Sequence, residues 1–138
     1  MDKKDKAIVE ALKENSRYSV RDIAKKTRIR PSTVHQRIQK LLKEGIIEKF
    51  TIKLDDKKTG ENFIVFMLLN TSKDLGKQFL DHPNLKEAFG ITGEYDLLVK
   101  FKFSDVEEFN KFIINLRKFE EIEKTLTMIG TVKIKEEI

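Results

Sequence analysis

Between Arg30 and Ile47, side chains that can read nucleic acid stand opposite an apolar stripe. At about 100° per residue, Val34, Ile38 and Leu41 fall on one side of a helix, and amides, hydroxyls and cations fall on the other. A glutamine amide can hydrogen-bond an adenine through two atoms at once, so Gln36 is the strongest candidate for reading a base. The other candidates on that side are Ser32, Thr33 and Gln39.

Basic side chains surround this stretch. Between Arg21 and Glu44, eight lysines and arginines stand against two acidic residues. Cations at that density suit the phosphates of a nucleic acid, which position a protein but carry little sequence information. The candidates for phosphate contact are Arg28, Arg30, Arg37, Lys40 and Lys43. A solvated basic surface is the alternative interpretation, and the neighbouring elements decide between the two.

Three helices are expected to position these side chains. Apolar residues at helical spacing predict a first helix over residues 3–14, and Ser19 with Asp22 marks the start of a second over 20–27. Pro31 suits the first position of a third helix, which Gly45 ends. Two helices joined by a tight turn, with a free polar face on the second, form a helix-turn-helix that enters the major groove of DNA. Residues 46–52 alternate enough to predict a strand, the wing of this domain.

Charge and composition exclude several classes of protein. Residues 1–52 carry 14 lysines and arginines against 7 acids, whereas residues 53–138 carry 14 against 16, so the basic character lies in the front part. Without cysteine, and with only His35 and His82, no disulfide or metal site is expected. The start lacks the apolar core of a signal peptide, and no apolar run could span a bilayer. We therefore expect a soluble, cytoplasmic protein without a membrane partner.

Catalytic chemistry is not expected. A nucleophile with its base, a metal site and a phosphate cradle are all missing at their usual spacing. Adjacent acids such as Glu107 and Glu108 are typical of a solvated surface. The protein is predicted not to be an enzyme and to need no cofactor.

The rear part is predicted to be a second domain. The polar segment 53–61 is the expected hinge between domains at 1–52 and 62–138. The pattern predicts an α+β protein whose second domain has the βαββαβ order of a ferredoxin-like antiparallel sheet with two helices on one face. The expected elements are strand 62–71, helix 74–80, strands 85–92 and 95–103, helix 105–118 and strand 122–134.

The first of these strands is apolar on both of its faces. Phe63 to Leu69 places apolar residues at every position, although helices are expected over only one face of the sheet. An apolar strand face without a covering layer marks an interface. The residues on that second face are predicted to lie between subunits and are Ile64, Phe66 and Leu68.

The sequence GITG, from Gly90 to Gly93, admits two interpretations. It is a tight turn between strands or the loop of an RNA-binding KH domain, but a KH loop opens a helix, whereas EYDLLVKFKF continues as a strand. The aromatic signature of RNA-recognition sheets is also missing. RNA binding and a pure oligomerisation scaffold are the alternative functions, but only a DNA-binding protein accounts for both parts of the chain.

Two long stretches resemble the Lrp/AsnC family, the feast/famine regulators of bacteria and archaea. They are SVRDIAKKTRIRPSTVHQRIQKLLKEGIIEKFTI and GITGEYDLLVKF, and the resemblance covers nearly the whole chain, with an archaeal character. It implies that the helix beginning at Pro31 is the recognition helix. It also implies that a small effector, often an amino acid, binds near Gly90, Thr92, Gly93 and Asp96. Dimers of the family assemble further, into tetramers or octamers.

One position departs from the family pattern. The family commonly has Gly-Leu-Ser in the turn, where this chain has Arg28, Ile29 and Arg30. Losing the glycine strains a left-handed turn, losing the serine removes a helix cap, and two cations at a helix start oppose its dipole. Nearby DNA phosphates would offset that cost.

Taken together, the motifs and the resemblance predict a sequence-specific transcriptional regulator, activator or repressor. We expect it to bind palindromic double-stranded DNA as a dimer or higher oligomer and to contact transcription machinery.

Overall fold

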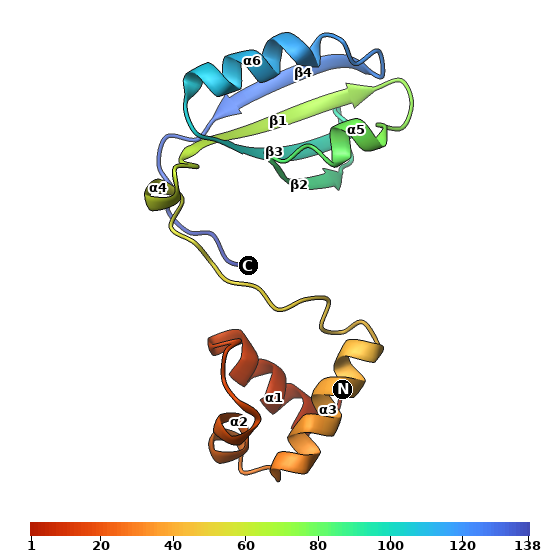
Figure 1. Cartoon of the computed structure of the whole chain (residues 1–138). Coiled ribbons are helices and arrows are strands. Elements are labelled where there is room, and N and C mark those ends of the chain that lie inside the picture. Colours follow the sequence, from red (N-terminus) through yellow and green to blue (C-terminus); the bar gives the residue numbers. More distant parts are fainter. The chain divides into compact units, whose positions relative to one another are not determined.

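The computed structural model describes all 138 residues, which form two compact units at 1–53 and 54–138 (Figure 1). The first unit holds three helices, and the second holds a four-stranded sheet with its helices. The helices are α1 (Lys3–Glu14), α2 (Val20–Thr27), α3 (Pro31–Lys43), α4 (Asp56–Thr59), α5 (Lys77–Leu80) and α6 (Val106–Leu116). The strands are β1 (Phe63–Thr71), β2 (Leu85–Gly90), β3 (Leu97–Phe103) and β4 (Ile122–Ile129).

Side chains fix the starts of the first helices. The Asp2 carboxylate accepts from the Asp5 backbone N–H at the start of α1, and the Ser19 hydroxyl accepts from Asp22 at the start of α2, each answered by the reciprocal bond of a capping box. Proline opens α3. The apolar stripes of the three helices meet in a core made of Ile8, Ala11, Ile23, Ala24, Val34 and Leu41.

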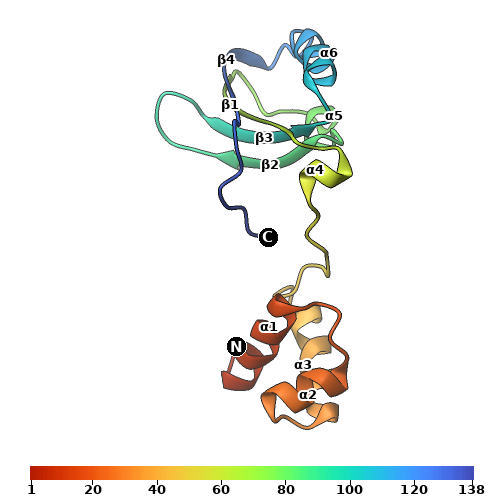
Figure 2. The ribbon, with the colours of Figure 1, turned by 90° about the vertical axis from the view of Figure 1, so that its left-hand side faces the viewer.

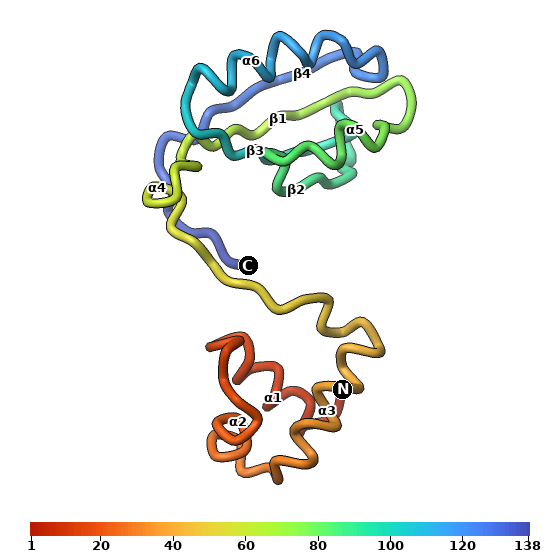
Figure 3. The backbone as a smooth tube through the Cα atoms, viewed as in Figure 1, coloured from red at the N-terminus to blue at the C-terminus, as the bar shows by residue number.

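The strand predicted over residues 46–52 is wrong. After α3 the chain turns at Gly45, which has a φ of 72°, and residues 48–55 have no regular secondary structure (Figure 3). A strand is stabilised by backbone bonds to a neighbouring strand, and the first unit contains only helices. The alternating side chains therefore stay exposed, Phe50 and Ile52 among them.

The sheet of the second unit has the order β2-β3-β1-β4, and every neighbouring pair is antiparallel. This confirms the predicted βαββαβ fold, and α5 and α6 lie on the same side of the sheet (Figure 2). Alternate residues of β1 and β3 point into the core beneath the helices. The core consists of Val65, Met67, Leu69, Phe79, Val99, Phe101, Phe103, Phe109, Phe112 and Leu116.

Neither α5 nor α6 covers the opposite side of the sheet, which we call the open face. Phe66 of β1 stands beside Met128 of β4, and Leu68 stands between Leu98 and Leu126, so large apolar side chains from neighbouring strands lie together. Phe66 is 37% exposed, and Leu126 and Met128 are exposed to a similar degree. The residues of this apolar patch are Ile64, Phe66, Leu68, Phe89, Leu98, Leu126 and Met128.

An ionic cluster occupies the remainder of the open face. Lys100 and Lys102 of β3 are almost completely buried, and Lys102 Nζ lies 3.0 Å from Asp56 Oδ2 of α4 and 2.8 Å from Glu136 Oε1 of the C-terminal segment. Hydrogen bonds from Lys100 and Lys102 lower the pKa of Glu136 to about 2. Three lysines and three acids make up this Lys102 cluster: Asp56, Glu87, Lys100, Lys102, Lys133 and Glu136. It ties both α4 and the C-terminal segment to the sheet.

Candidate nucleic-acid interface and effector loop

The polar face of α3 is free, as its periodicity predicted. Val34 and Leu41 are buried in the core of the first unit, while Ser32, Gln36 and Gln39 are exposed and Thr33 is half-buried. No hydrogen bond to another side chain engages the amide of Gln36 or of Gln39. Lys40 and Lys43 are exposed farther along the same helix, so uncharged donors and acceptors stand beside cations. That combination is the one that a major groove and its flanking phosphates require.

The turn between α2 and α3 is strained, as the departure from the family pattern predicted. Arg28 has a φ of 59° and a ψ of 31°, and it is the only residue other than glycine with a positive φ. The left-handed conformation costs a residue with a Cβ about 1–2 kcal/mol. Arg30 is the residue before α3 and makes no side-chain cap. Both arginine side chains are exposed, so the turn presents two cations at the leading end of α3.

Arg28→Gly is expected to separate stability from DNA affinity. Glycine removes the left-handed strain but adds freedom to the unfolded chain, so the free energy of unfolding should stay the same or rise by up to about 1 kcal/mol. Binding to any duplex should weaken, because one phosphate contact per subunit is lost. Thermal unfolding and salt-dependent binding measure the two effects, and Arg28→Ala, which keeps the strain, is the control. A glycine variant that binds DNA as tightly as the wild type would exclude Arg28 from the interface.

Arg37, a predicted phosphate contact, differs from the other basic candidates because it pairs with carboxylates of α1. It lies about 60° around α3 from Val34, at the border of the buried stripe, so its guanidinium meets α1. Nη1 is 2.5 Å from Asp2 Oδ2 and 3.2 Å from Asp5 Oδ1. Two carboxylates thus pair with Nη1 of this guanidinium, and the role of Arg37 as a phosphate contact stays a prediction. The remaining basic candidates are Arg28, Arg30, Lys40 and Lys43.

The second candidate site is the loop between β2 and β3, where the GITG sequence forms a turn between strands. Gly90 ends β2, and Gly93 has a φ of 113°, which glycine adopts without strain. The Ile91 N–H donates to the Asp96 carbonyl and closes the loop. Gly90, Thr92 and Gly93 are exposed, so backbone and hydroxyl groups of the loop are open to a small molecule.

Asp96 fastens this loop to the neighbouring strand. Its Oδ2 accepts hydrogen bonds from the Thr71 N–H at 3.2 Å and from the Thr71 hydroxyl at 3.0 Å. Lys124 of β4 lies over the ring of Tyr95 and pairs with Glu94, 3.1 Å from Oε1. Sequence reasoning missed Thr71 and Lys124, because only the pairing of β1 with its neighbours brings them to the loop.

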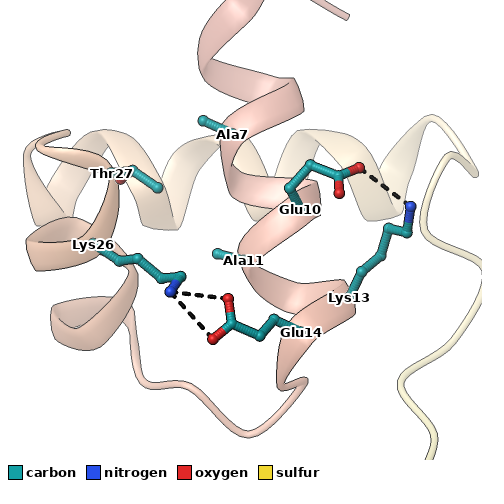
Figure 4. A pocket seen from close by; sticks show the side chains of 7 residues that line it. All are labelled: Ala7, Glu10, Ala11, Lys13, Glu14, Lys26 and Thr27. Atoms are coloured by element: carbon teal, nitrogen blue, oxygen red, sulfur yellow. Dashed lines mark hydrogen bonds and ion pairs between the residues drawn. The ribbon is translucent and has the colours of Figure 1, made fainter.

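A surface hollow of about 650 Å³ lies between α1 and α2 (Figure 4). The small side chains of Ala7 and Ala11 leave the space, and its charged side chains pair with one another. Glu14 Oε2 is 2.9 Å from Lys26 Nζ, and Glu10 Oε1 is 3.2 Å from Lys13 Nζ. The charged side chains of the hollow therefore neutralise one another, whereas the exposed face of α3 carries an excess of cations.

Metal-binding clusters and membrane-spanning helices are both absent from the structure. Acidic, histidine and cysteine side chains do not come together in groups of three or more that could hold a metal ion. None of the helices is long and apolar enough to cross a membrane.

Both units match known protein families. Residues 1–48 match the model of winged helix-turn-helix DNA-binding domains, and residues 65–138 match that of the Lrp/AsnC ligand binding domain. An uncharacterized HTH-type transcriptional regulator of Pyrococcus furiosus is 39% identical over 146 residues, which cover 100% of this chain and 97% of that protein.

Solved structures share the architecture. AsnC of E. coli is 25% identical, with a TM-score of 0.85 over 100% of this chain and 97% of that one. A transcriptional regulator of Neisseria meningitidis, in complex with L-Met, has a TM-score of 0.88 at 22% identity, over 99% of this chain and 94% of that one. The second likeness concerns the fold alone.

Proposed function

The chain belongs to the Lrp/AsnC family of transcriptional regulators, and from that membership we propose that it binds palindromic operators as a dimer under the control of an amino-acid-type effector. The observation that carries the proposal is the free polar face of α3 beside exposed cations. The first unit is a DNA-binding helix-turn-helix made of α2 and α3, and α3, the second helix of this motif, enters the major groove.

Within this proposal, base reading and positioning fall to different side chains. Ser32, Thr33, Gln36 and Gln39 face the base edges, and Gln36 is the residue suited to a two-atom contact with adenine. Arg28, Arg30, Lys40 and Lys43 hold the phosphates. Phosphate contacts made by the two cations before α3 would offset the free-energy cost of the strained turn and of the missing helix cap.

A dimer has the two-fold symmetry that matches a palindromic operator. The apolar patch of the open face is large and lacks a covering layer, and a second copy can cover it with the same patch. Ile64, Phe66 and Leu68 stand at its middle strand. Two recognition helices then reach half-sites about one helical turn of DNA, or a multiple of it, apart. Further assembly into tetramers or octamers, and contact with transcription machinery, complete the proposal.

The loop of Gly90, Thr92, Gly93 and Asp96 is the proposed effector site. Exposed backbone N–H groups suit a carboxylate, and the Asp96 carboxylate suits an ammonium. The bond from Thr71 holds that carboxylate in place, which favours a preformed site. The protein acts by binding rather than catalysis, and we expect it in the cytoplasm with chromosomal DNA.

Salt dependence tests the proposed phosphate contacts. Four cations per subunit cover about eight phosphates in the dimer, so the slope of log affinity against log salt concentration should be near −7. Titration of a duplex at several salt concentrations measures this slope. A flat dependence would contradict the assignment of the four cations. Lys13→Gln, in α1 and outside the interface, should keep the slope of the wild type.

A further inference from the structure

The start of α1 carries a pair of carboxylates that the helix alone does not satisfy. Asp5 is 3% exposed, so its charge is removed from water and needs a partner. The capping box supplies one, because the Asp2 N–H donates to Asp5 Oδ2 at 3.1 Å. The other partner is a cation that comes from a different helix.

That cation is Arg37, in the middle of α3. Its Nη1 donates to Asp5 and also to Asp2, whose second carboxylate oxygen caps the Asp5 N–H at 2.9 Å. The hydrogen bonds to Asp2 and Asp5 raise the pKa of Arg37. A hydrogen bond from the Asp5 backbone and the one from Arg37 lower the pKa of Asp2 to about 2. Arg37 and Asp2 are therefore charged at neutral pH, and the acidic side chains beside the guanidinium offset its positive charge.

This charge balance has a consequence for DNA. A phosphate that approached Arg37 would also approach Asp2 and Asp5, and like charges repel. The guanidinium is moreover partly shielded, with 27% of the side chain exposed. Arg37 is thus poorly placed to hold a phosphate, although it lies within the basic stretch of α3.

The position of Arg37 suits another role. It directly precedes the apolar residue Ile38 and directly follows Gln36, so the angle at which Arg37 meets α1 also sets the angle at which Gln36 points outward. The apolar contacts of Val34 and Leu41 hold α3 against the core but are non-directional. The bonds to two carboxylates are directional and fix the rotation of the helix about its axis.

We propose that Asp2, Asp5 and Arg37 form a positioning clamp that fixes the rotation of the recognition helix and thereby its selectivity among DNA sequences. The inference rests on the proposed function, because it concerns how α3 meets base edges. Arg37 is a positioning residue in this account: it acts through Gln36 and its neighbours. The recognised ligand is the base edge of a duplex, and the clamp itself contacts no DNA.

The test compares binding to two duplexes, namely one selected by the wild-type protein from a random pool and an unrelated duplex of equal length. Arg37→Gln should weaken binding to the selected duplex by roughly 5- to 150-fold, the scale of one lost base contact. Binding to the unrelated duplex, and the salt slope, should stay unchanged. Asp5→Asn, which keeps the arginine, should likewise lower the ratio of the affinity for the selected duplex to the affinity for the unrelated duplex.

Control variants separate this role from others. Gln36→Ala gives the scale of a lost base contact, and Lys43→Gln gives the pattern of a lost phosphate contact, with a smaller salt slope and equal losses on both duplexes. Arg37→Lys keeps a cation and should recover part of the selectivity. Asp2→Asn removes only the more exposed carboxylate and tests the clamp if Arg37→Gln does not fold.

Three results would overturn the clamp. One is an Arg37→Gln protein that behaves like Lys43→Gln, which would make Arg37 a phosphate contact after all. Another is unchanged selectivity in Arg37→Gln and Asp5→Asn, or, where Arg37→Gln does not fold, in Asp5→Asn and Asp2→Asn. The third is an equal loss of affinity for both duplexes in all clamp variants, accompanied by a fall in their thermal stability. Failure of the proposed function looks different, because the wild-type protein would then select no duplex.

Discussion

Replacing Phe66 with glutamate is expected to convert the proposed dimer into a monomer. Phe66 stands on the middle strand of the apolar patch, between Lys100 and Met128 of the neighbouring strands. In a symmetric interface the substitution places two carboxylates in an apolar contact, where each loses hydration, and the neighbouring Lys100 is already engaged by Glu87 and Glu136. The cost is several kcal/mol, so the dissociation constant of the dimer should rise by at least about a hundredfold.

Light scattering at several protein concentrations measures this effect. The matched control is Ile114→Glu, at a side chain that is 62% exposed on α6, on the helix side of the sheet. That variant should keep the mass of the wild type. An unchanged mass for Phe66→Glu would show that the open face is not the subunit interface. A monomeric variant should also lose operator binding, because a single helix-turn-helix reads only one half-site.

Lys102→Ala is expected to destabilise the second unit strongly. Lys102 is 9% exposed and bonds to both Asp56 and Glu136, so its removal leaves two carboxylates near the sheet with one cation fewer between them. Breaking a buried pair in this way costs about 3 kcal/mol, at the lower end of the usual range, because Lys133 still partners both acids. The melting temperature of the second unit should fall by more than about 10 °C.

A surface pair provides the control for this prediction. Lys124→Ala breaks the pair with Glu94, whose two side chains are both largely exposed, and solvent screening leaves such pairs little influence on stability. The melting temperature of that variant should stay close to the wild-type value. Equal effects from both substitutions would show that the Lys102 cluster stabilises no more than a surface ion pair does.

The helices of the first unit were predictable from local signals. The predicted bounds of 3–14 and 20–27 coincide with α1 and α2, because Asp2 and Ser19 supply side-chain caps at fixed positions. Pro31 marks the start of α3 in the same way. Such signals act within four residues along the chain, so the sequence alone reveals them.

Element ends that depend on a partner were less predictable. The last strand was expected to reach residue 134 but ends at Ile129, because its partner β1 begins at Phe63 and the Gly130 N–H makes the final bond, to Ile64. The helix expected over 74–80 begins only at Lys77. The strand expected over 46–52 has no partner at all within its unit. Alternation of side chains indicates a strand but not its neighbour.

In the candidate sites too, some features follow from the local sequence and others depend on contacts between distant residues. The free face of α3 follows from helical periodicity, so Ser32, Gln36 and Gln39 were identified correctly as exposed. The engagement of Arg37 by Asp2 joins residues 35 positions apart, and the Lys102–Asp56 bond joins residues 46 apart. Neither contact has a local signature, since each depends on how separate elements pack.

Selection of bound duplexes from a random DNA pool, with single-stranded RNA as competitor, separates a DNA-reading dimer from the RNA-binding and scaffold alternatives. A dimer that reads DNA through α3 should recover a palindrome whose half-sites lie about one helical turn, or a multiple of it, apart. That result would supply the operator for the experiments on Gln36 and Arg37. Preference for RNA, or recovery of no common sequence, would contradict a dimeric regulator that reads DNA through α3.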